Sequence, residues 1–300
     1  MTPLFEVLKE GVVATFQDLG RFGYDDIGVS NSGASDELSY TLTNRLLNNP
    51  KNCATIELTI GKLKLKALNS CRIAIGGANT RAKLNDKIVK NWSAFPMKKD
   101  DILELGYAID GQLTYLAVEG GFEAEKILGS VSVSKHLGRA IKKGDILKGK
   151  ISTNKQRSFL SPKITPNLAK KELVLRFTRG YQSEWFDVDD FCKKSFKVSN
   201  RYNKMGYQLT GDEIIPKKRE LISEAIAYGA IQITALGQPI ILLKDRQTIG
   251  GYPKIGSVLP MDCFKLSQCG ANTKITFKEI SLNRARELVR NFYAKLNYLM

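Results

Sequence analysis

Hydrophobic and polar positions in the first half of the chain alternate with the period of a β-strand more often than with that of a helix. Several short apolar runs end in glycine turns, as strands do where the chain reverses. The pattern predicts strands at 72–77, 112–121 and 146–147.

One helix is predicted in this half, over residues 35–48. Its leucines recur at a spacing of four, which places them on one helical face. Ser35 or Asp36 can cap the first turn, and the sequence Asn48-Asn49-Pro50 ends the pattern.

The second half begins after a polar stretch, 154–171, in which the periodicity fades and which we interpret as a linker. Strands are predicted at 173–177 and 274–277, and residues 231–243 are typical of a hairpin.

Two helices are expected in the second half, a short one over 187–196 and a longer one over 281–297. The longer helix is amphipathic, and its apolar face indicates packing against the core or a partner. That face comprises Leu282, Ala285, Leu288, Val289, Phe292 and Leu296.

Strands and helices do not alternate as a doubly wound fold requires. The pattern therefore predicts a mainly β protein with a few helices, built from two β-rich barrels or sandwiches. We expect an N-terminal domain over 1–153, the linker over 154–171 and a C-terminal domain over 172–300.

The composition is that of a globular protein, with 43% hydrophobic and 25% charged residues among 300. There are 46 basic and 30 acidic residues, a net charge of +16, which attracts anions. The lysines are scattered and no RNA-binding aromatic motif accompanies them, so we expect a solvated basic surface and no nucleic-acid partner. No apolar run approaches the length of a membrane span and no signal peptide is evident, so a cytoplasmic protein without membrane contact is expected.

Several classes of enzyme lack the residues they need. The five cysteines have no CxxC spacing, and the single histidine, His136, excludes multi-histidine metal sites, so no metal is expected. The GxxxxGK match at Gly144–Lys150 is followed by Ile151 instead of the Ser or Thr of a phosphate-binding loop. GxSxG and GxGxxG motifs are absent as well.

Three polar segments punctuated by glycine are candidates for a binding site, because directed hydrogen bonds from such a set suit a polar ligand. The alternative for each is an ordinary turn held by its own side chains. The segments are 17–36, 204–209 and 244–254, the last of which follows an apolar strand.

Together these segments resemble the biotin-dependent carboxyltransferase family, which includes the C subunit of 5-oxoprolinase, allophanate hydrolase subunit 2 and the Kip antagonist protein. The resemblance extends from about residue 4 to 280. Its motifs include QDLGR-x-G-Y from Gln17, SGA-x-D from Ser32, MGY from Met205, LISE from Leu221 and GQPIILLKDRQTIGGYPKI from Gly237.

The resemblance implies two cyclophilin-like β-barrel domains and membership of a complex that uses ATP to open 5-oxo-L-proline to L-glutamate. Its partners would be homologues of the A and B subunits of 5-oxoprolinase, and the chain would be inactive without them. No biotin-attachment sequence occurs, so no covalently bound cofactor is expected. The alternatives are a carboxyltransferase subunit that moves a carboxyl group from biotin on a partner to a urea-like amide, and a non-catalytic regulatory protein.

The resemblance also implies site residues. Arg21 and Lys254 would hold a carboxylate or an oxyanion, and Asp18 or Asp245 would orient them or act as a base. Tyr207 and Tyr252 would stack on a small ring. The further substrate-binding candidates are Gln17, Ser32, Asp36, Met205, Gly206, Gln232, Thr248, Gly250 and Gly251.

Overall fold

The computed structural model describes residues 2–217 and 221–298, and the chain forms two compact units. Unit 1 holds the chain up to Arg21 and then Ser32–Ala169, and unit 2 holds Lys170–Asn297. Unit 2 also includes Phe22–Asn31, so the chain enters unit 2 briefly before it completes unit 1.

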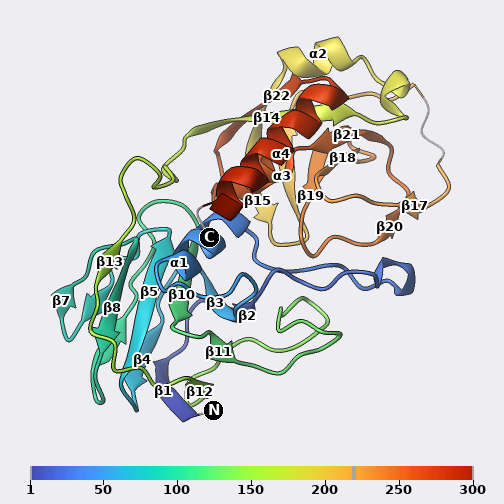
Figure 1. The fold of residues 1–300 in the computed structure, drawn as a ribbon. Coiled ribbons are helices and arrows are strands. Elements are labelled where there is room, and N and C mark those ends of the chain that lie inside the picture. Colours follow the sequence, from blue (N-terminus) through green and yellow to red (C-terminus); the bar gives the residue numbers. More distant parts are fainter. Residues whose placement is uncertain (1, 218–220, 299–300) are drawn as a thin grey trace. The chain divides into compact units, whose positions relative to one another are not determined.

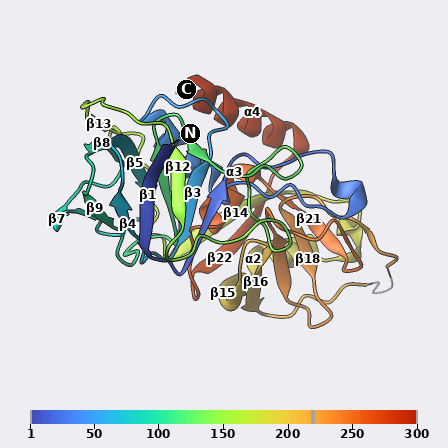
Figure 2. The ribbon, with the colours of Figure 1, turned by 90° about the horizontal axis from the view of Figure 1, so that it is seen from below.

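Unit 1 is built from two antiparallel sheets that share one core (Figures 1 and 2). Phe5 and Leu65 of one sheet and Ile56 and Ile73 of the other belong to the same buried cluster. The first sheet has the order β11 (Phe122–Glu123), β12 (Ile146–Gly149), β1 (Thr2–Lys9), β4 (Lys64–Ala67), β9 (Ile102–Glu104), β6 (Lys83–Leu84) and β7 (Lys87–Ile88). The second has the order β13 (Ser158–Phe159), β8 (Ser93–Met97), β5 (Cys71–Gly77), β10 (Leu113–Val118), β3 (Thr55–Thr59) and β2 (Val13–Gln17).

Helix α1 (Glu37–Arg45) covers the outer face of the second sheet, over β5 and β10. These two strands are therefore buried on both faces, which explains their nearly continuous apolar sequences. Gly76 permits the close approach, because a Cβ there would collide with Thr43 Oγ1 on the helix. Asp36 is the N-cap, and its carboxylate accepts a hydrogen bond from Ser39 N at 3.1 Å.

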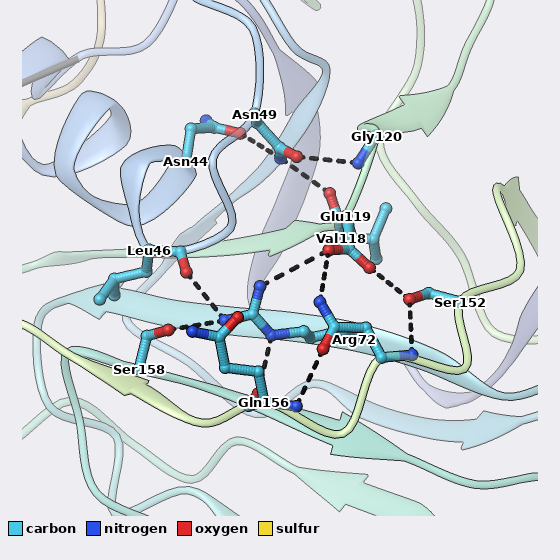
Figure 3. Close-up of polar contacts among 11 residues, drawn as sticks. Asn44, Leu46, Asn49, Arg72, Val118, Glu119, Gly120, Ser152, Gln156 and Ser158 are labelled. Carbon is cyan, nitrogen blue, oxygen red and sulfur yellow. Dashed lines mark hydrogen bonds and ion pairs between the residues drawn. The ribbon is translucent and has the colours of Figure 1, made fainter.

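A buried guanidinium fixes the end of unit 1 (Figure 3). Arg72 on β5 is 1% exposed, and it donates to the carbonyl of Gln156 at 2.8 Å, to Ser158 Oγ at 2.7 Å and to the carbonyl of Leu46 at 3.2 Å. Glu119 lies 3.6 Å from Arg72 Nη1. Arg72 thus joins the segment that follows residue 150 to the sheet and to the end of α1.

Unit 2 contains a closed seven-stranded barrel with one parallel pair, β14 (Glu172–Arg179) with β22 (Lys274–Glu279). Phe177, Phe191, Phe196 and Phe277 pack in its core, and the ring centroids of Phe191 and Phe277 lie 4.5 Å apart. The order is β14 (Glu172–Arg179), β21 (Lys254–Val258), β18 (Ala230–Ile233), β19 (Pro239–Leu242), β16 (Gly206–Gly211), β15 (Ser195–Tyr202) and β22 (Lys274–Glu279).

Helices, turns and a small sheet accompany the barrel of unit 2. Helix α3 (Pro260–Leu266) packs on β14, and α4 (Leu282–Tyr298) packs on α3 through Phe292 and Phe264, whose ring centroids lie 6.0 Å apart (Figure 1). The elements are the 3-10 turns η1 (Asp25–Ile27) and η2 (Ser183–Trp185), helices α2 (Val188–Lys193), α3 (Pro260–Leu266) and α4 (Leu282–Tyr298), and the two-stranded sheet of β17 (Glu224–Ala225) and β20 (Ile249–Gly250).

The mainly β class predicted from the sequence is confirmed, as are α1, the hairpin of β18 and β19, and the C-terminal helix. The short helix expected over 187–196 ends at Lys193, because β15 already begins at Ser195. Helix α3 is an addition that the sequence pattern did not predict. Within the described ranges, no helix is both long and apolar enough to cross a membrane.

Candidate functional site

The first motif, at the end of β2, is bonded into unit 1. Asp18 is buried, and its carboxylate accepts from Gly20 N at 2.8 Å, Ser130 Oγ at 2.5 Å, Ser132 Oγ at 2.7 Å and Val131 N at 3.0 Å. Four neutral donors satisfy the charge of the carboxylate where water cannot reach it. The carboxylate therefore fixes the loop around residues 130–132 to the turn after β2.

Other predicted residues of this motif bind the same loop. Arg21 Nε donates to the carbonyl of Ile127 at 3.3 Å, and its Nη2 donates to that of Ser132. Gln17 Nε2 donates to the carbonyl of Val133 at 2.8 Å, and Ser32 Oγ donates to the same oxygen at 3.4 Å. The motif thus assembles around the 127–133 loop, more than 100 residues along the chain.

A second carboxylate, that of Glu57, organises the start of α1. It accepts from Ser35 N at 2.7 Å, from Ser35 Oγ at 3.0 Å and from the Tyr115 hydroxyl at 2.7 Å. Burial raises the pKa of Tyr115 well above its usual value, and the nearby Glu57 adds to the shift. The Tyr115 hydroxyl is therefore a neutral donor, and Asp36 beside it serves as the helix cap.

A cavity of about 240 Å³ opens beside the 127–133 loop in unit 1. Its lining includes Ser130–Val133 of the loop together with Arg139 and Asp145. Arg139 donates to Asp145 at 2.7 and 3.0 Å, and this bidentate contact lowers the pKa of the carboxyl group although its partial burial acts in the other direction. None of the residues predicted as site residues lines this cavity among those described.

In unit 2, Lys254 occupies the first position of β21 and is 9% exposed. Its ammonium forms an ion pair with Glu224 of β17 and donates to the carbonyl of Ala225 at 3.3 Å. Gln182 links the two, since its Nε2 donates to Glu224 Oε1 at 2.8 Å and its Oε1 accepts from Lys254 N at 2.8 Å. We call Lys254, Glu224 and Gln182 the lysine cluster.

The turn between β20 and β21 lies directly before the lysine cluster. Gly250 packs closely, because a Cβ there would lie 2.6 Å from Ile226 Cδ1 and 3.2 Å from Gln232 Nε2. Gln232 is buried, and its Nε2 donates to the carbonyl of Tyr252 at 3.3 Å. The structure therefore brings together the predicted residues Gln232, Gly250, Tyr252 and Lys254.

Beside this turn is a mostly apolar cavity of about 290 Å³. Gly251 and Tyr252 line one side, and Ile214, Ile215 and Leu236 contribute apolar walls. Tyr252 as a whole residue is 43% exposed and lines the cavity. The volume is near the lower end of the range for small-molecule sites.

The remaining predicted residues of unit 2 are not members of the lysine cluster. Tyr207 packs in the core, and its hydroxyl donates to the carbonyls of Ser267 and Cys269, so its ring is not available for stacking on a ligand. Met205 and Gly206 form the turn into β16, and Asp245 N donates to the carbonyl of Lys204 at 2.9 Å. Thr248 supplies a carbonyl to Ile226 N at 2.9 Å.

Sequence reasoning missed two members of the lysine cluster. Glu224 lies in the LISE motif, where the resemblance implied no role for the acid, and Gln182 lies outside all the motifs that carry the resemblance. Neither residue is close to Lys254 in the sequence, so no local pattern predicts that Glu224 and Gln182 contact it.

The lysine cluster presents a largely buried ammonium beside an open turn, held by Glu224 and by the carbonyl of Ala225. A buried ammonium can bind a carboxylate or stabilise an oxyanion, because its charge acts strongly where water is excluded. Among the described residues, no group of three or more His, Cys, Asp or Glu is arranged to hold a metal ion.

Comparison with known proteins places these observations in a family. The model of the carboxyltransferase domain, subdomains A and B, matches residues 27–279. The chain is 32% identical to the C subunit of 5-oxoprolinase from Escherichia coli over 293 residues, which are 94% of this chain and 93% of the bacterial protein. It is 28% identical to the urea amidolyase of Lachancea kluyveri over 95% of this chain.

Solved structures agree with this match. The urea amidolyase of K. lactis superposes on the whole of this chain with a TM-score of 0.90 at 26% identity. This chain spans about a fifth of the length of that structure, and 17% of the Lachancea kluyveri amidolyase. The resemblance indicated by the motifs is confirmed.

Proposed function

This chain belongs to the biotin-dependent carboxyltransferase family, and from that premise we propose that it is the C subunit of an ATP-dependent 5-oxoprolinase. The complex would open 5-oxo-L-proline to L-glutamate together with homologues of the A and B subunits. The observation that supports this proposal most strongly is the correspondence with 93% of the bacterial C subunit.

The lysine cluster gives the proposal a chemical basis. The Lys254 ammonium would hold the substrate carboxylate or the oxyanion that forms when the lactam carbonyl is attacked. Glu224 and Gln182 would fix the direction of the ammonium, and the Tyr252 ring would cover the face of the lactam ring. In unit 1, Asp18 and Arg21 are bonded to the 127–133 loop, and their role would be to hold that loop in place.

Reconstitution tests the proposal directly. This chain and the homologues of the A and B subunits are mixed in every combination, and 5-oxoproline-dependent ATP hydrolysis and glutamate release are both measured. We expect glutamate only when all three are present. Glutamate that forms equally well without this chain contradicts the proposal.

Substitution of the lysine cluster tests the site. Lys254→Met and Glu224→Gln are each expected to lower kcat by roughly 10²–10³-fold, the usual effect of losing an oxyanion donor or its orientation. Lys278→Met, at an exposed position of β22, is the matched control and should leave turnover unchanged. Wild-type turnover in both Lys254→Met and Glu224→Gln would contradict a role of Lys254 in the reaction.

A second function is favoured by the likeness to urea amidolyase, whose structure matches the whole chain. In that case the lysine cluster would bind a urea-like amide that takes a carboxyl group from biotin on a partner. Transfer of labelled carboxyl from carboxybiotin to urea, dependent on Lys254, would support it. Glutamate release without any biotin would favour the lactam reaction.

A further inference from the structure

The segment Phe22–Asn31 belongs to unit 2 although its neighbours in the sequence on both sides belong to unit 1. It contains the 3-10 turn η1 and is closed by hydrogen bonds from Gly28 N to the carbonyl of Asp25 and from Val29 N to that of Tyr24. In Figure 1 it is the extended blue loop that carries one short coil. We call it the strap.

Arg246 is the residue of unit 2 that binds the strap most directly. Its Nη2 donates to Asn31 Oδ1 at 3.1 Å and lies 3.6 Å from Asp25 Oδ1. The residue is 7% exposed, and burial lowers its pKa although Asp25 acts in the opposite direction. A guanidinium with this degree of burial needs polar partners, and the strap supplies two of them.

The same guanidinium also binds the chain segment that carries Glu224 of the lysine cluster. Arg246 Nε donates to the carbonyl of Ile226 at 3.0 Å. The adjacent carbonyl, that of Ala225, accepts from Lys254 Nζ, and Glu224 precedes it. Lys254 and Arg246 therefore bind the consecutive carbonyls of Ala225 and Ile226, which directly follow Glu224.

We propose that Arg246 is a positioning residue that fastens the strap to β17 and thereby holds Glu224 in register with Lys254. The short sheet of β17 and β20 has two residues in each strand, so its own ladder holds it weakly. Arg246 adds a bond that is independent of that ladder. Only the effect on turnover rests on the proposed function, whereas the mechanical link does not.

The alternative is that Arg246 merely neutralises Asp25. The two interpretations differ in what the strap does to β17. If Arg246 couples them, removing a strap contact loosens the amide of Ile226, which is bonded to the carbonyl of Thr248. If Arg246 only balances charge, that amide keeps its protection when the strap is altered.

Amide hydrogen exchange on the full chain distinguishes these interpretations. Arg246→Met and Asn31→Ala are compared with wild type, and peptides covering 22–31 and 224–226 are followed. We expect exchange to rise at least tenfold in both regions for Arg246→Met and in the same two regions, to a smaller extent, for Asn31→Ala. Unchanged exchange at 224–226 in both variants overturns the proposal.

Arg246→Lys provides a rescue test, because an ammonium can reach the Ile226 carbonyl or the strap but lacks the fork that binds both. We expect protection to be restored only in part and in both regions together, because one ammonium replaces the contacts of Arg246 with Ile226, Asn31 and Asp25 incompletely. Arg179→Met is the control, since Arg179 makes an exposed bidentate contact with Glu279 at 2.8 Å and should leave both regions unchanged.

Turnover in the reconstituted complex provides the functional readout. Arg246→Met should lower kcat about tenfold or more with a smaller change in KM, and Arg246→Lys should recover part of the loss. An equal fall of activity in Arg179→Met overturns a specific role for Arg246. Absence of glutamate in the wild-type mixture would refute the proposed function, while the exchange data would still decide the link between strap and β17.

Discussion

At the scale of single residues, two buried charges of unit 1, those of Asp18 and Arg72, are satisfied mainly by neutral groups. Asp18 accepts from two serine hydroxyls and two backbone amides, and Arg72 donates to two carbonyls and a serine. Hydrogen bonds to an ionised group in a dry environment are strong, which offsets the cost of removing the charge from water. These residues therefore hold loops in place.

The family resemblance implied that Asp18 and Arg21 take part in catalysis, and that role stays a prediction. Their hydrogen-bond partners on the 127–133 loop lie more than 100 residues away, and no local pattern reveals such a contact. Lys254 and Gly250 lie near one another because only a short turn separates them in the sequence. Glu224 and Gln182 were missed because their relation to Lys254 is also long-range.

The first prediction concerns Arg72. Arg72→Met should lower the free energy of unfolding by about 3–5 kcal/mol, the cost of breaking a buried polar network from one side. Urea denaturation measures the change, and proteolysis should show faster cleavage between 150 and 159. Arg139→Met removes an ion pair whose arginine side chain is 70% exposed, so it should shift the midpoint little. Equal midpoints for wild type and Arg72→Met would contradict the prediction.

At the scale of secondary-structure elements, α1 and α3 show what local sequence can and cannot predict. Helix α1 has a capping acid and a leucine repeat, and both are visible in the sequence. Helix α3 has seven residues, begins at Pro260 without a side-chain cap and is buried on most sides, so it has no clear amphipathic period. Its position depends on a tertiary contact instead.

That contact is made by Asp262 in the first turn of α3. Its carboxylate accepts from Arg176 Nε at 2.7 Å, Arg176 Nη2 at 2.8 Å and Lys265 Nζ at 2.9 Å. Burial alone would raise the pKa of Asp262, but the bonds from Arg176 and Lys265 outweigh it and lower the pKa below its usual value. The stabilisation is present above the ordinary carboxyl pKa of about 3.9 and is lost as pH falls through the lower, folded-state value.

Asp262→Asn tests this account. The variant should be less stable than wild type near pH 7, and the difference should shrink as pH falls below about 4, where the unfolded wild-type chain takes up a proton at Asp262 that the folded protein binds only at lower pH. Urea unfolding at a series of pH values measures it. Asp189→Asn, an exposed acid of α2 that lies 3.9 Å from Arg179, is the control and should show no such convergence. A difference that stays constant with pH would refute the role of the charge.

At the scale of the whole molecule, the sequence predicted two β-rich parts and a family. The closed barrel of unit 2 follows from strands whose apolar positions alternate, and unit 1 follows the sandwich alternative. The family was recognisable because its motifs are spread over most of the chain. The passage of Phe22–Asn31 into unit 2 was not predicted, since a short polar segment has no periodicity and its anchor, Arg246, lies 215 residues from Asn31.

The strap has a consequence for how this protein can be divided. A fragment that begins at residue 170 would contain the barrel strands but not Asp25 or Asn31, so the guanidinium of Arg246 would lose both strap partners. We expect this fragment to melt at a lower temperature than the same fragment mixed with a synthetic peptide of residues 22–31. The Arg246→Met fragment should not respond to the peptide, and an equal response would contradict the expectation. The coding sequence therefore does not consist of two exchangeable modules in tandem. Recombination at its midpoint would separate the strap from the rest of unit 2. We therefore expect the two halves to be inherited together.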